Sequence, residues 1–399
     1  MNILVFNGGS SSLTFKLFKT EKNCDPQISF LGKVHRIGVK GAEPSFIEYS
    51  DGSTSERIEI AIKNHEQAAS IVLKLIKESG KAVDCIGHRF VHGGQYFHSS
   101  AAINKEIMEK LRKCIPLAPI HNPISLSVIR EAQKAYKDAF QFVTFDAAFH
   151  STIPEKAYVY PLPKKIVKKY GFRKYGFHGL SYQSVLREVS LHCDKGLQGK
   201  KIVVCHLGTG GASVTAIESG RSIDTSMGFS PLSGLIMSTR CGDIDPMLMI
   251  YVCYTFGYRP DDLLELLEKK SGLLGISGFS SDIRDILKTD RTGQAYIAVR
   301  MCIHRIKKYI GNYIGALNGI DMLVFTDDIG VQNHEVRKMV CENMGWCGIV
   351  LDQKLNRNAD VSEMCELSEK GSKVKILSVP NREELMICLE GIRLLEKKS

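Results

Sequence analysis

An internal duplication is the feature that most constrains the fold of this chain. Residues 3–6 form an apolar run, followed by a glycine- and serine-rich turn at 7–12 and a second apolar run at 13–18. The same order returns at residues 202–205, 206–213 and 214–217. Both copies are typical of a strand, a tight turn and a second strand. A chain of 399 residues is too long for one core, so the pattern predicts two domains with one copy in each.

Strand and helix patterns alternate through the rest of the chain. Helical spacing of apolar residues is found at 64–80, 124–137, 261–270, 296–317 and from about 382 onward. Short apolar runs at 83–90, 322–325 and 374–379 are typical of strands. This mixture predicts an α/β protein. We expect one domain at residues 1–148 plus about 383–399 and the other at 149–382.

The chain is basic, with 53 lysines and arginines against 43 aspartates and glutamates. One interpretation is an ordinary solvated surface, and another is attraction for phosphates and carboxylates. Nucleic acid is not expected as a partner, because the densest basic run, at 164–174, lies in no recognisable nucleic-acid module.

Cysteine usage and the N-terminus predict a cytoplasmic location. The twelve cysteines include no CxxC pair, which indicates free thiols in a reducing compartment. The first residues lack the basic region and long apolar run of a secretion signal. The longest apolar stretch, at 247–258, is too short to cross a bilayer, so no membrane partner is expected.

The two glycine-rich turns predict anion binding. Neither contains the GxxxxGK[ST] or GxGxxG pattern of the common nucleotide-binding loops. Both carry small residues that let backbone N–H groups approach an anion, with hydroxyl groups beside them. One such turn is weak evidence, whereas two after apolar strands could hold a phosphate chain from both sides.

A series of motifs identifies a family. The opening FNGGSSSL at 6–13 resembles that of the acetate kinase family, and further resemblances follow in the family order at 87–94, 118–123, 145–150, 175–179, 205–208, 224–228, 239–246, 271–285 and 383–385. The resemblance covers essentially the whole chain. It implies a duplicated actin- and hexokinase-like (ribonuclease H-like) two-domain α/β fold with an interdomain cleft, and a homodimer.

The resemblance implies four catalytic residues. Arg89 and Arg240 would flank the acyl-phosphate site, His178 would bind the phosphoryl oxygens, and Asp146 would orient the acid substrate or hold arginine and metal. Guanidinium groups suit this chemistry because phosphoryl transfer spreads negative charge over the moving group. Taken alone, each arginine would be a surface ion-pair partner and the histidine a core residue.

Further binding positions follow from the same resemblance. A small apolar pocket that favours acetate without excluding propionate would be formed beside Arg89 and His121 by Val91, Ile120, Phe177 and Pro231. Asn7 and Glu383 match positions associated with Mg²⁺, with Mn²⁺ as an alternative. The phosphate donor would contact Ser10, Ser12, Thr14, His206, Gly208, Thr209, Gly210 and Gly211. A structural role is an equal alternative for His121 and His206.

Departures from the family pattern fall on the donor side. Thr14 stands where the family commonly has lysine, and Thr209 replaces asparagine between two glycines. In the adenosine motif, Asp327 and Asp328 replace alanine and glycine. Their side chains would fill space that a purine needs and repel a polyanion. Residues 90, 180–182, 209–211 and 326–327 also resemble the diphosphate-using branch of the family.

These departures favour a donor with phosphates and no base. The predicted reaction is acetyl phosphate plus orthophosphate giving acetate plus diphosphate, reversibly. The adenosine pocket, vestigial in this interpretation, would comprise Asp282, Ile283, Arg284, Asp327 and Asp328. Arg284 could pair with either aspartate of the loop and close the pocket. Alternatively, the two aspartates turn to solvent and the enzyme is an ATP-dependent acetate kinase. A different acid substrate and a binding protein without turnover are further alternatives.

Overall fold

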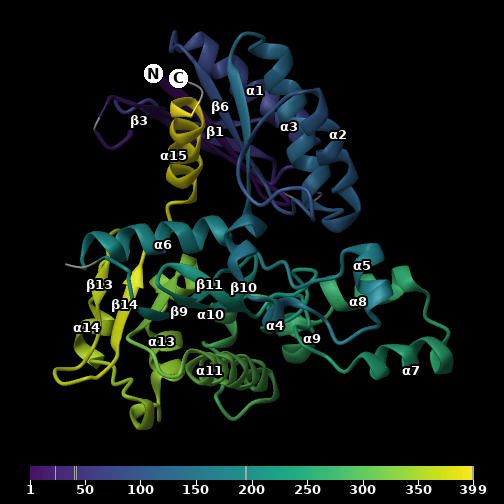
Figure 1. Ribbon diagram of the computed structural model, residues 1–399, viewed down its shortest axis with the longest axis vertical. Helices are drawn as coiled ribbons and strands as arrows, with labels where there is room; N and C mark the ends of the chain where they lie inside the picture. Colours follow the sequence, from purple (N-terminus) through teal and green to yellow (C-terminus); the bar gives the residue numbers. More distant parts are fainter. Residues whose placement is uncertain (23, 40, 42, 194–195, 398–399) are drawn as a thin grey trace. The chain divides into compact units, whose positions relative to one another are not determined.

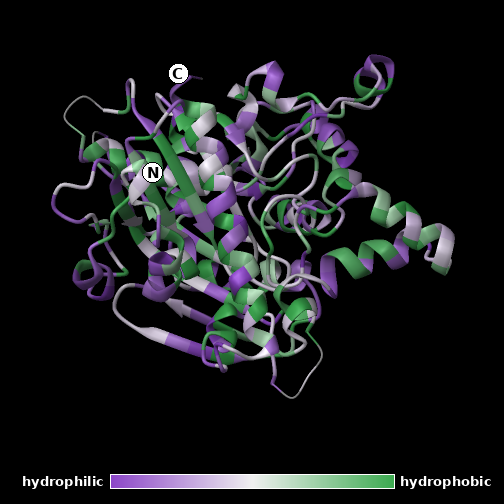
Figure 2. Ribbon diagram, turned by 90° about the horizontal axis from the view of Figure 1, so that it is seen from below, coloured by the Kyte–Doolittle hydropathy of each residue, from purple (hydrophilic) through white to green (hydrophobic). Residues whose placement is uncertain are grey.

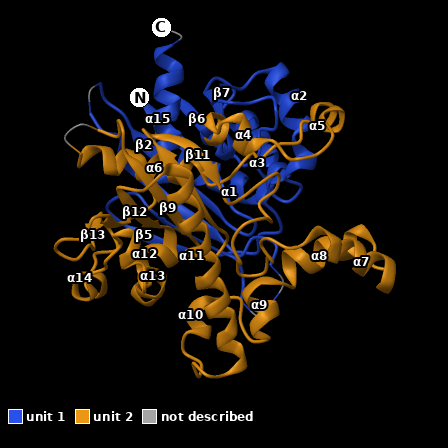
Figure 3. Ribbon diagram, turned by 60° about the horizontal axis from the view of Figure 1, so that its bottom comes forward, with its two compact units in different colours: residues 1–149, 382–399 blue, residues 150–381 orange. Residues whose placement is uncertain are grey.

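The computed structural model divides into two compact units, residues 1–149 with 382–399 and residues 150–381 (Figure 3). The expected domains had boundaries at 148/149 and 382/383. The structure describes all residues except 23, 40, 42, 194–195 and 398–399. The last two belong to the expected first domain and lie outside the described residues. Each unit is an α/β structure with its own mixed sheet (Figure 1).

Unit 1 is built on a sheet in the order β5-β4-β3-β2-β1-β6-β8-β7. The first repeat forms its centre, because β1 pairs antiparallel with β2 and parallel with β6. β6 in turn pairs parallel with β8, so β1, β6 and β8 end at the same edge. The strands are β1 (Asn2–Gly8), β2 (Leu13–Lys19), β3 (Gln27–His35), β4 (Phe46–Ser50), β5 (Ser55–Glu59), β6 (Cys85–Phe90), β7 (Ala101–Ala102) and β8 (Phe140–Phe145).

Helices cover both faces of this sheet. On one face, α1 and α3 bury a core with Leu4, Phe6 and Phe15. On the other, α15 lies against β1 and β6, where Gly87 and Gly391 leave room for the Phe142 ring. The helices of unit 1 are α1 (His65–Glu78), α2 (Lys105–Lys113), α3 (His121–Ala135) and α15 (Glu383–Glu396).

Helix starts follow local chemistry. The Asn64 side chain accepts a hydrogen bond from the backbone of Gln67 and begins α1. The helix expected at 124–137 begins three residues earlier, at His121, because Pro123 is tolerated in a first turn that lacks intrahelical N–H partners.

Unit 2 repeats the plan of unit 1. Its sheet has the order β11-β10-β9-β12-β14-β13. β9 and β10 are antiparallel, whereas β9, β12 and β14 run parallel, as do β1, β6 and β8 in unit 1. The predicted duplication is therefore present in the topology. The strands are β9 (Lys201–Leu207), β10 (Ala212–Glu218), β11 (Arg221–Thr225), β12 (Met322–Thr326), β13 (Cys365–Glu366) and β14 (Lys375–Val379).

The sheet of unit 2 lies between α6 and α11 (Figure 1). α11 packs on β9 and β10, with buried side chains such as Ile303, Ile306 and Ile310. The helices are α4 (Glu155–Tyr158), α5 (Lys164–Tyr170), α6 (Gly179–Leu191), α7 (Pro246–Phe256), α8 (Pro260–Lys269), α9 (Gly272–Ser277), α10 (Ile283–Ile286), α11 (Ile297–Leu317), α12 (Asp327–Gln332), α13 (His334–Cys341) and α14 (Gln353–Arg357).

Helix α7 extends away from the sheet of unit 2 and is coloured largely hydrophobic at the right-hand edge of Figure 2. None of its residues is buried, and Tyr254 is 88% exposed. Within the described residues, no helix is both long and apolar enough to cross a membrane.

Candidate active site

Arg89 and Asp146 meet at one edge of the sheet in unit 1. Arg89 is near the end of β6, and Asp146 follows the last residue of the neighbouring parallel strand β8. The guanidinium Nη2 lies 2.6 Å from Asp146 Oδ2, and Nε lies 3.1 Å from both carboxylate oxygens. Asp146 is 1% exposed, so this is a largely buried, charge-assisted pair.

A third strand brings Asn7 to the same edge. Its Oδ1 accepts a hydrogen bond of 2.8 Å from Arg89 Nη1. Its Nδ2 donates to Glu383 Oε2 at 3.0 Å and to Glu384 Oε1 at 2.8 Å, at the start of α15. Glu384 also pairs with Lys16 of β2 at 2.9 Å. Lys16 and Glu384 were not predicted as site residues, although Glu384 adjoins a residue that was.

The electrostatics of this cluster fix Arg89 as a cation. Burial acts to lower the pKa of its guanidinium, but Asp146, Glu383 and Glu384 outweigh burial and raise that pKa. With at least two carboxylates near it, Arg89 is charge-compensated in this structure. An anionic substrate at this arginine would therefore compete with Asp146 and Glu383.

The oxygens of Asn7, Glu383 and Glu384 are chemically suited to a hard cation such as Mg²⁺. They do not form a closed metal cage: among the described residues, no cluster of three or more His, Cys, Asp or Glu side chains could hold a metal. Such an open set of oxygens could hold an ion only if the ion kept most of its waters.

The first glycine-rich turn joins β1 to β2. It is closed by a hydrogen bond of 2.9 Å from the Gly9 N–H to the Ser12 carbonyl oxygen. Ser10 is exposed at its tip, and Ser12 and Thr14 are partly exposed. His121 is the first residue of α3, preceded by Ile120, which is exposed, and Val91 lies buried just after β6.

The second turn joins β9 to β10 in unit 2 and meets two of the predicted catalytic residues. A methyl group placed on Gly211 would lie 3.3 Å from His178 Nε2 and 3.5 Å from Arg240 Nη1. The structure therefore brings the predicted His178, Arg240 and Gly211 together. A glycine here leaves the space above the turn open to a ligand.

Arg240 differs from Arg89 in that no carboxylate pairs with it among the residues that the structure describes. Within the described part of the chain, its Nη1 has hydrogen-bond contacts to the Pro231 carbonyl oxygen, at 3.4 Å, and to the Met237 sulfur, at 3.7 Å. No ion pair to Arg240 occurs among the described residues, and burial lowers the pKa of its guanidinium although Glu268 opposes the effect. A partly buried cation without a carboxylate partner is costly, so an anion at this position would be favourable.

His178 and His206 stack beside the turn, with ring centroids 4.0 Å apart. His206 Nε2 lies 3.2 Å from Asp327 Oδ2, and its Nδ1 lies 2.9 Å from Ser181 Oγ. Because a carboxylate only accepts, His206 donates from Nε2. His178 Nδ1 lies 2.8 Å from Ser213 Oγ. Ser181 and Ser213 were not predicted as site residues, because nothing in the sequence shows which serine contacts a histidine.

The two aspartates of the altered adenosine motif turn toward the second turn rather than to solvent. Asp328 Oδ1 accepts a hydrogen bond of 2.9 Å from the Thr209 N–H. Asp327 has a left-handed φ of 67° and lies so close to Gly208 that an added methyl group would be 2.0 Å from its Oδ2. Thr209 was predicted to contact the phosphate donor, and in this structure its backbone amide is held by the Asp328 carboxylate.

Arg284 pairs chiefly with its own neighbour. Its Nη2 lies 2.5 Å from Asp282 Oδ2, whereas its Nη1 is 4.0 Å from Asp328 Oδ2. The expected pairing with the loop aspartates is therefore secondary. The hydrogen bonds from Arg284 lower the pKa of Asp282.

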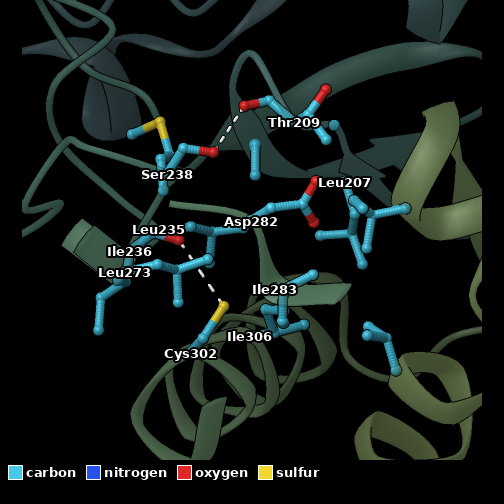
Figure 4. A pocket seen from close by; sticks show the side chains of 15 residues that line it. Leu207, Thr209, Leu235, Ile236, Ser238, Leu273, Asp282, Ile283, Cys302 and Ile306 are labelled. Carbon is cyan, nitrogen blue, oxygen red and sulfur yellow. Dashed lines mark hydrogen bonds between the residues drawn. The ribbon is translucent and has the colours of Figure 1, made fainter. Parts of the chain in front are cut away.

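The predicted adenosine region encloses a cavity of only about 40 Å³ (Figure 4). Thr209, Asp282 and Ile283 line it together with apolar side chains from β9, α9 and α11. Ligand pockets usually measure about 300–1,000 Å³, so this cavity does not hold a purine in the present conformation. Phe177, predicted for the acyl pocket, is 1% exposed and offers almost no surface to a substrate here.

Comparison with known proteins agrees with this architecture. The family model described as the acetokinase family matches residues 2–389. An acetate kinase of Caldicellulosiruptor saccharolyticus is 41% identical, with 100% of both chains covered. The crystal structure of an acetate kinase from Entamoeba histolytica has a TM-score of 0.89 and 40% identity, over 99% of this chain and 100% of that one. A propionate kinase from Francisella tularensis has a TM-score of 0.88 and 33% identity, over 98% of this chain and 99% of that one.

The duplicated α/β units, the two glycine-rich turns and these likenesses define a phosphotransferase of the acetate and propionate kinase type. The chain belongs to the acetokinase family.

Proposed function

We propose that this enzyme transfers a phosphoryl group between acetate and inorganic diphosphate. In one direction, an oxygen of orthophosphate attacks the phosphorus of acetyl phosphate. The bond from that phosphorus to the acyl oxygen breaks, and acetate leaves as diphosphate forms. The sum is acetyl phosphate plus orthophosphate giving acetate plus diphosphate, and the reaction is reversible.

The environment of Arg240 is the main observation in favour of phosphoryl transfer. It is a partly buried guanidinium without a carboxylate partner among the described residues, and it lies beside His178 at the open surface of Gly211. Charge that develops on a moving phosphoryl group would be stabilised there by a donor that is already in place. The reported names of the relatives support a small carboxylic acid as the other substrate.

The closed purine region supports diphosphate over a nucleotide. Asp328 occupies the Thr209 amide, and Asp327 covers Gly208. Both carboxylates would repel the phosphates of a nucleotide that extended past the turn. Diphosphate has no group beyond its second phosphate, so it needs neither the Thr209 amide nor the cavity in the adenosine region.

ATP remains the second candidate, and one observation favours it. Asp282, Ile283 and Arg284, which belong to the predicted adenosine pocket, form a short helix start next to the cavity. If the loop carrying Asp327 and Asp328 moved away from Gly208, this segment would again border an open pocket.

The remaining predicted residues receive roles by the same proposal. Arg89, oriented by Asp146, would bind the carboxylate or acyl phosphate, and Val91, Ile120 and Pro231 would limit the acyl chain. His178 would donate to a phosphoryl oxygen. Mg²⁺, bound near Asn7 and Glu383, would supply positive charge for the phosphates.

We also propose a homodimer in the cytoplasm. The exposed apolar surface of α7 supports self-association, since an uncovered helix of this composition is unfavourable in water. All twelve cysteines are free thiols, which supports a reducing compartment.

The donor assay tests the central proposal. Purified protein is given acetyl phosphate, Mg²⁺ and either orthophosphate or ADP, and both diphosphate and ATP are measured. We expect diphosphate formation to exceed ATP formation by at least tenfold in kcat/KM.

The Arg240→Ala variant should lose about 100-fold or more in turnover, on the scale of other preorganised charge contacts. Robust ATP production without diphosphate would refute the proposed donor, and an unchanged Arg240→Ala rate would refute the site.

A further inference from the structure

A buried chain of hydroxyl groups leads to His178. Tyr182, in the first turn of α6, places its hydroxyl 2.5 Å from Ser213 Oγ on β10. Ser213 Oγ in turn lies 2.8 Å from His178 Nδ1. Tyr182 and Ser213 are both 0% exposed, so water cannot replace either contact without a change in packing.

The hydroxyl group of Ser213 has one proton, so its hydrogen bond to His178 and its hydrogen bond to Tyr182 determine each other's direction. A serine hydroxyl donates once, so Ser213 can donate to His178 or to Tyr182 but not to both. If Tyr182 donates to Ser213, then Ser213 donates to His178 Nδ1. That order leaves the ring proton of a neutral His178 on Nε2.

The surroundings of His178 favour this order. Nε2 is the ring atom near Gly211 and Arg240, and a phosphoryl oxygen placed there can only accept a hydrogen bond. His178 is also the N-cap residue of α6 and lies near the uncompensated Arg240, where a second positive charge would be unfavourable. A neutral ring with its proton on Nε2 meets both conditions. Burial also raises the pKa of Tyr182, which keeps the phenol protonated as a donor.

We propose that Tyr182 and Ser213 are positioning residues that hold His178 as the tautomer with its proton on Nε2. They act through the histidine and do not contact the substrate. The inference rests on the proposed role of His178 and adds the device that keeps it ready to donate. His206, stacked on the same ring, is fixed in a similar way by Ser181 and Asp327.

Nitrogen NMR tests the tautomer without relying on turnover. The full-length protein is labelled with ¹⁵N-histidine, and the His178 signals are assigned as those lost in His178→Asn. We expect the wild type to show a protonated Nε2 and an unprotonated Nδ1. Tyr182→Phe and Ser213→Ala should shift His178 toward a mixture of tautomers. A protonated Nδ1 in the wild type, or an unchanged tautomer in both variants, would overturn the proposal.

Kinetics supply the second measurement. Tyr182→Phe should lower kcat by about 10- to 100-fold, by analogy with the loss seen when a partner that orients a metal-binding histidine is removed, with KM for acetyl phosphate nearly unchanged. Ser213→Thr keeps the hydroxyl group and should recover most of the activity lost in Ser213→Ala. A rise in KM for acetyl phosphate with an unchanged kcat would contradict a positioning role.

Tyr313→Phe is the matched control, because Tyr313 is also buried in unit 2 and its hydroxyl has no hydrogen-bond partner among the described residues. It should change neither the His178 signals nor kcat.

If the donor assay fails while the tautomer shifts as expected, the proposed reaction is refuted and the positioning role of Tyr182 and Ser213 is supported. If the reaction holds and the tautomer does not shift, only the present inference is lost.

Discussion

At the residue scale, Arg89 and Arg240 have the same side chain but differ in how far neighbouring groups compensate its charge. Arg89 is held by Asp146, Asn7 and Glu383. Arg240 has backbone and sulfur contacts alone among the described residues. The compensated arginine is preorganised by its neighbours, whereas the uncompensated one has spare attraction for an anion.

Asp328 provides a test of donor choice at one side chain. Asp328→Gly removes the carboxylate that holds the Thr209 amide. We expect kcat/KM for ADP with acetyl phosphate to rise about tenfold, equivalent to about 1.4 kcal/mol. Asp328→Asn serves as the control, since it removes the charge and keeps an acceptor oxygen for the amide. If neither variant improves the use of ADP, this side chain does not exclude the nucleotide.

The burial of His88 predicts that the protein loses stability in mild acid. It is 1% exposed, and burial lowers its pKa to about 4 although Gln141 acts in the opposite direction. An unfolded histidine has a pKa of about 6.5, so between these values the unfolded chain binds the proton and the native protein does not. The stability is therefore fully present above about pH 6.5 and falls as pH approaches 4.

Urea unfolding at pH 7 and pH 5 measures this contribution. We expect the wild type to lose about 1–3 kcal/mol more than His88→Gln over that interval. His98→Gln, at an exposed position, should behave like the wild type. An equal pH dependence in wild type and His88→Gln would contradict the assignment.

At the element scale, the position of α15 depends on close packing against β8. A methyl group on Gly391 would lie 2.6 Å from the Phe142 ring, so Gly391→Ala must displace the helix or the ring. We expect a loss of about 1–3 kcal/mol in the free energy of unfolding. Because α15 begins with Glu383 and Glu384, activity should fall as well.

Gly311→Ala is the matched control for this prediction. Gly311 is inside α11, and nothing lies within 4 Å of the position a methyl group would take. This variant should gain about 0.5–1 kcal/mol, because alanine loses less conformational freedom in a helix. A similar effect of both substitutions would show that packing against Phe142 is not the cause.

The elements that the sequence predicted are those with a clear local apolar periodicity. The long helix expected at 296–317 is α11, and the strand expected at 322–325 is β12. The outer strands β4 and β5 were not predicted. They present charged residues such as Glu48, Glu56 and Arg57, which carry little apolar signal.

At the scale of the whole molecule, the apolar surface of α7 predicts self-association. Leu248, Tyr251 and Tyr254 are 47%, 57% and 88% exposed. Leu248→Glu with Tyr254→Glu should shift a dimer to monomers in analytical ultracentrifugation, because buried unpaired carboxylates oppose the contact. Leu191→Glu is the control, since Leu191 is 64% exposed at the end of α6. A dimer that persists in the α7 variant would exclude this surface.

The sequence by itself determined the family, the duplicated α/β plan and the candidate arginines and histidines, because these depend on local periodicity and on motifs that are contiguous in the chain. Only the tertiary structure decided the partners of these groups. Asn7 meets Glu383 376 positions away, Thr209 meets Asp328 119 positions away, and Ser213 reaches His178 across 35. Such contacts arise from the packing of separate strands and helices, and that packing sets the charge, the proton position and the accessible space at each residue.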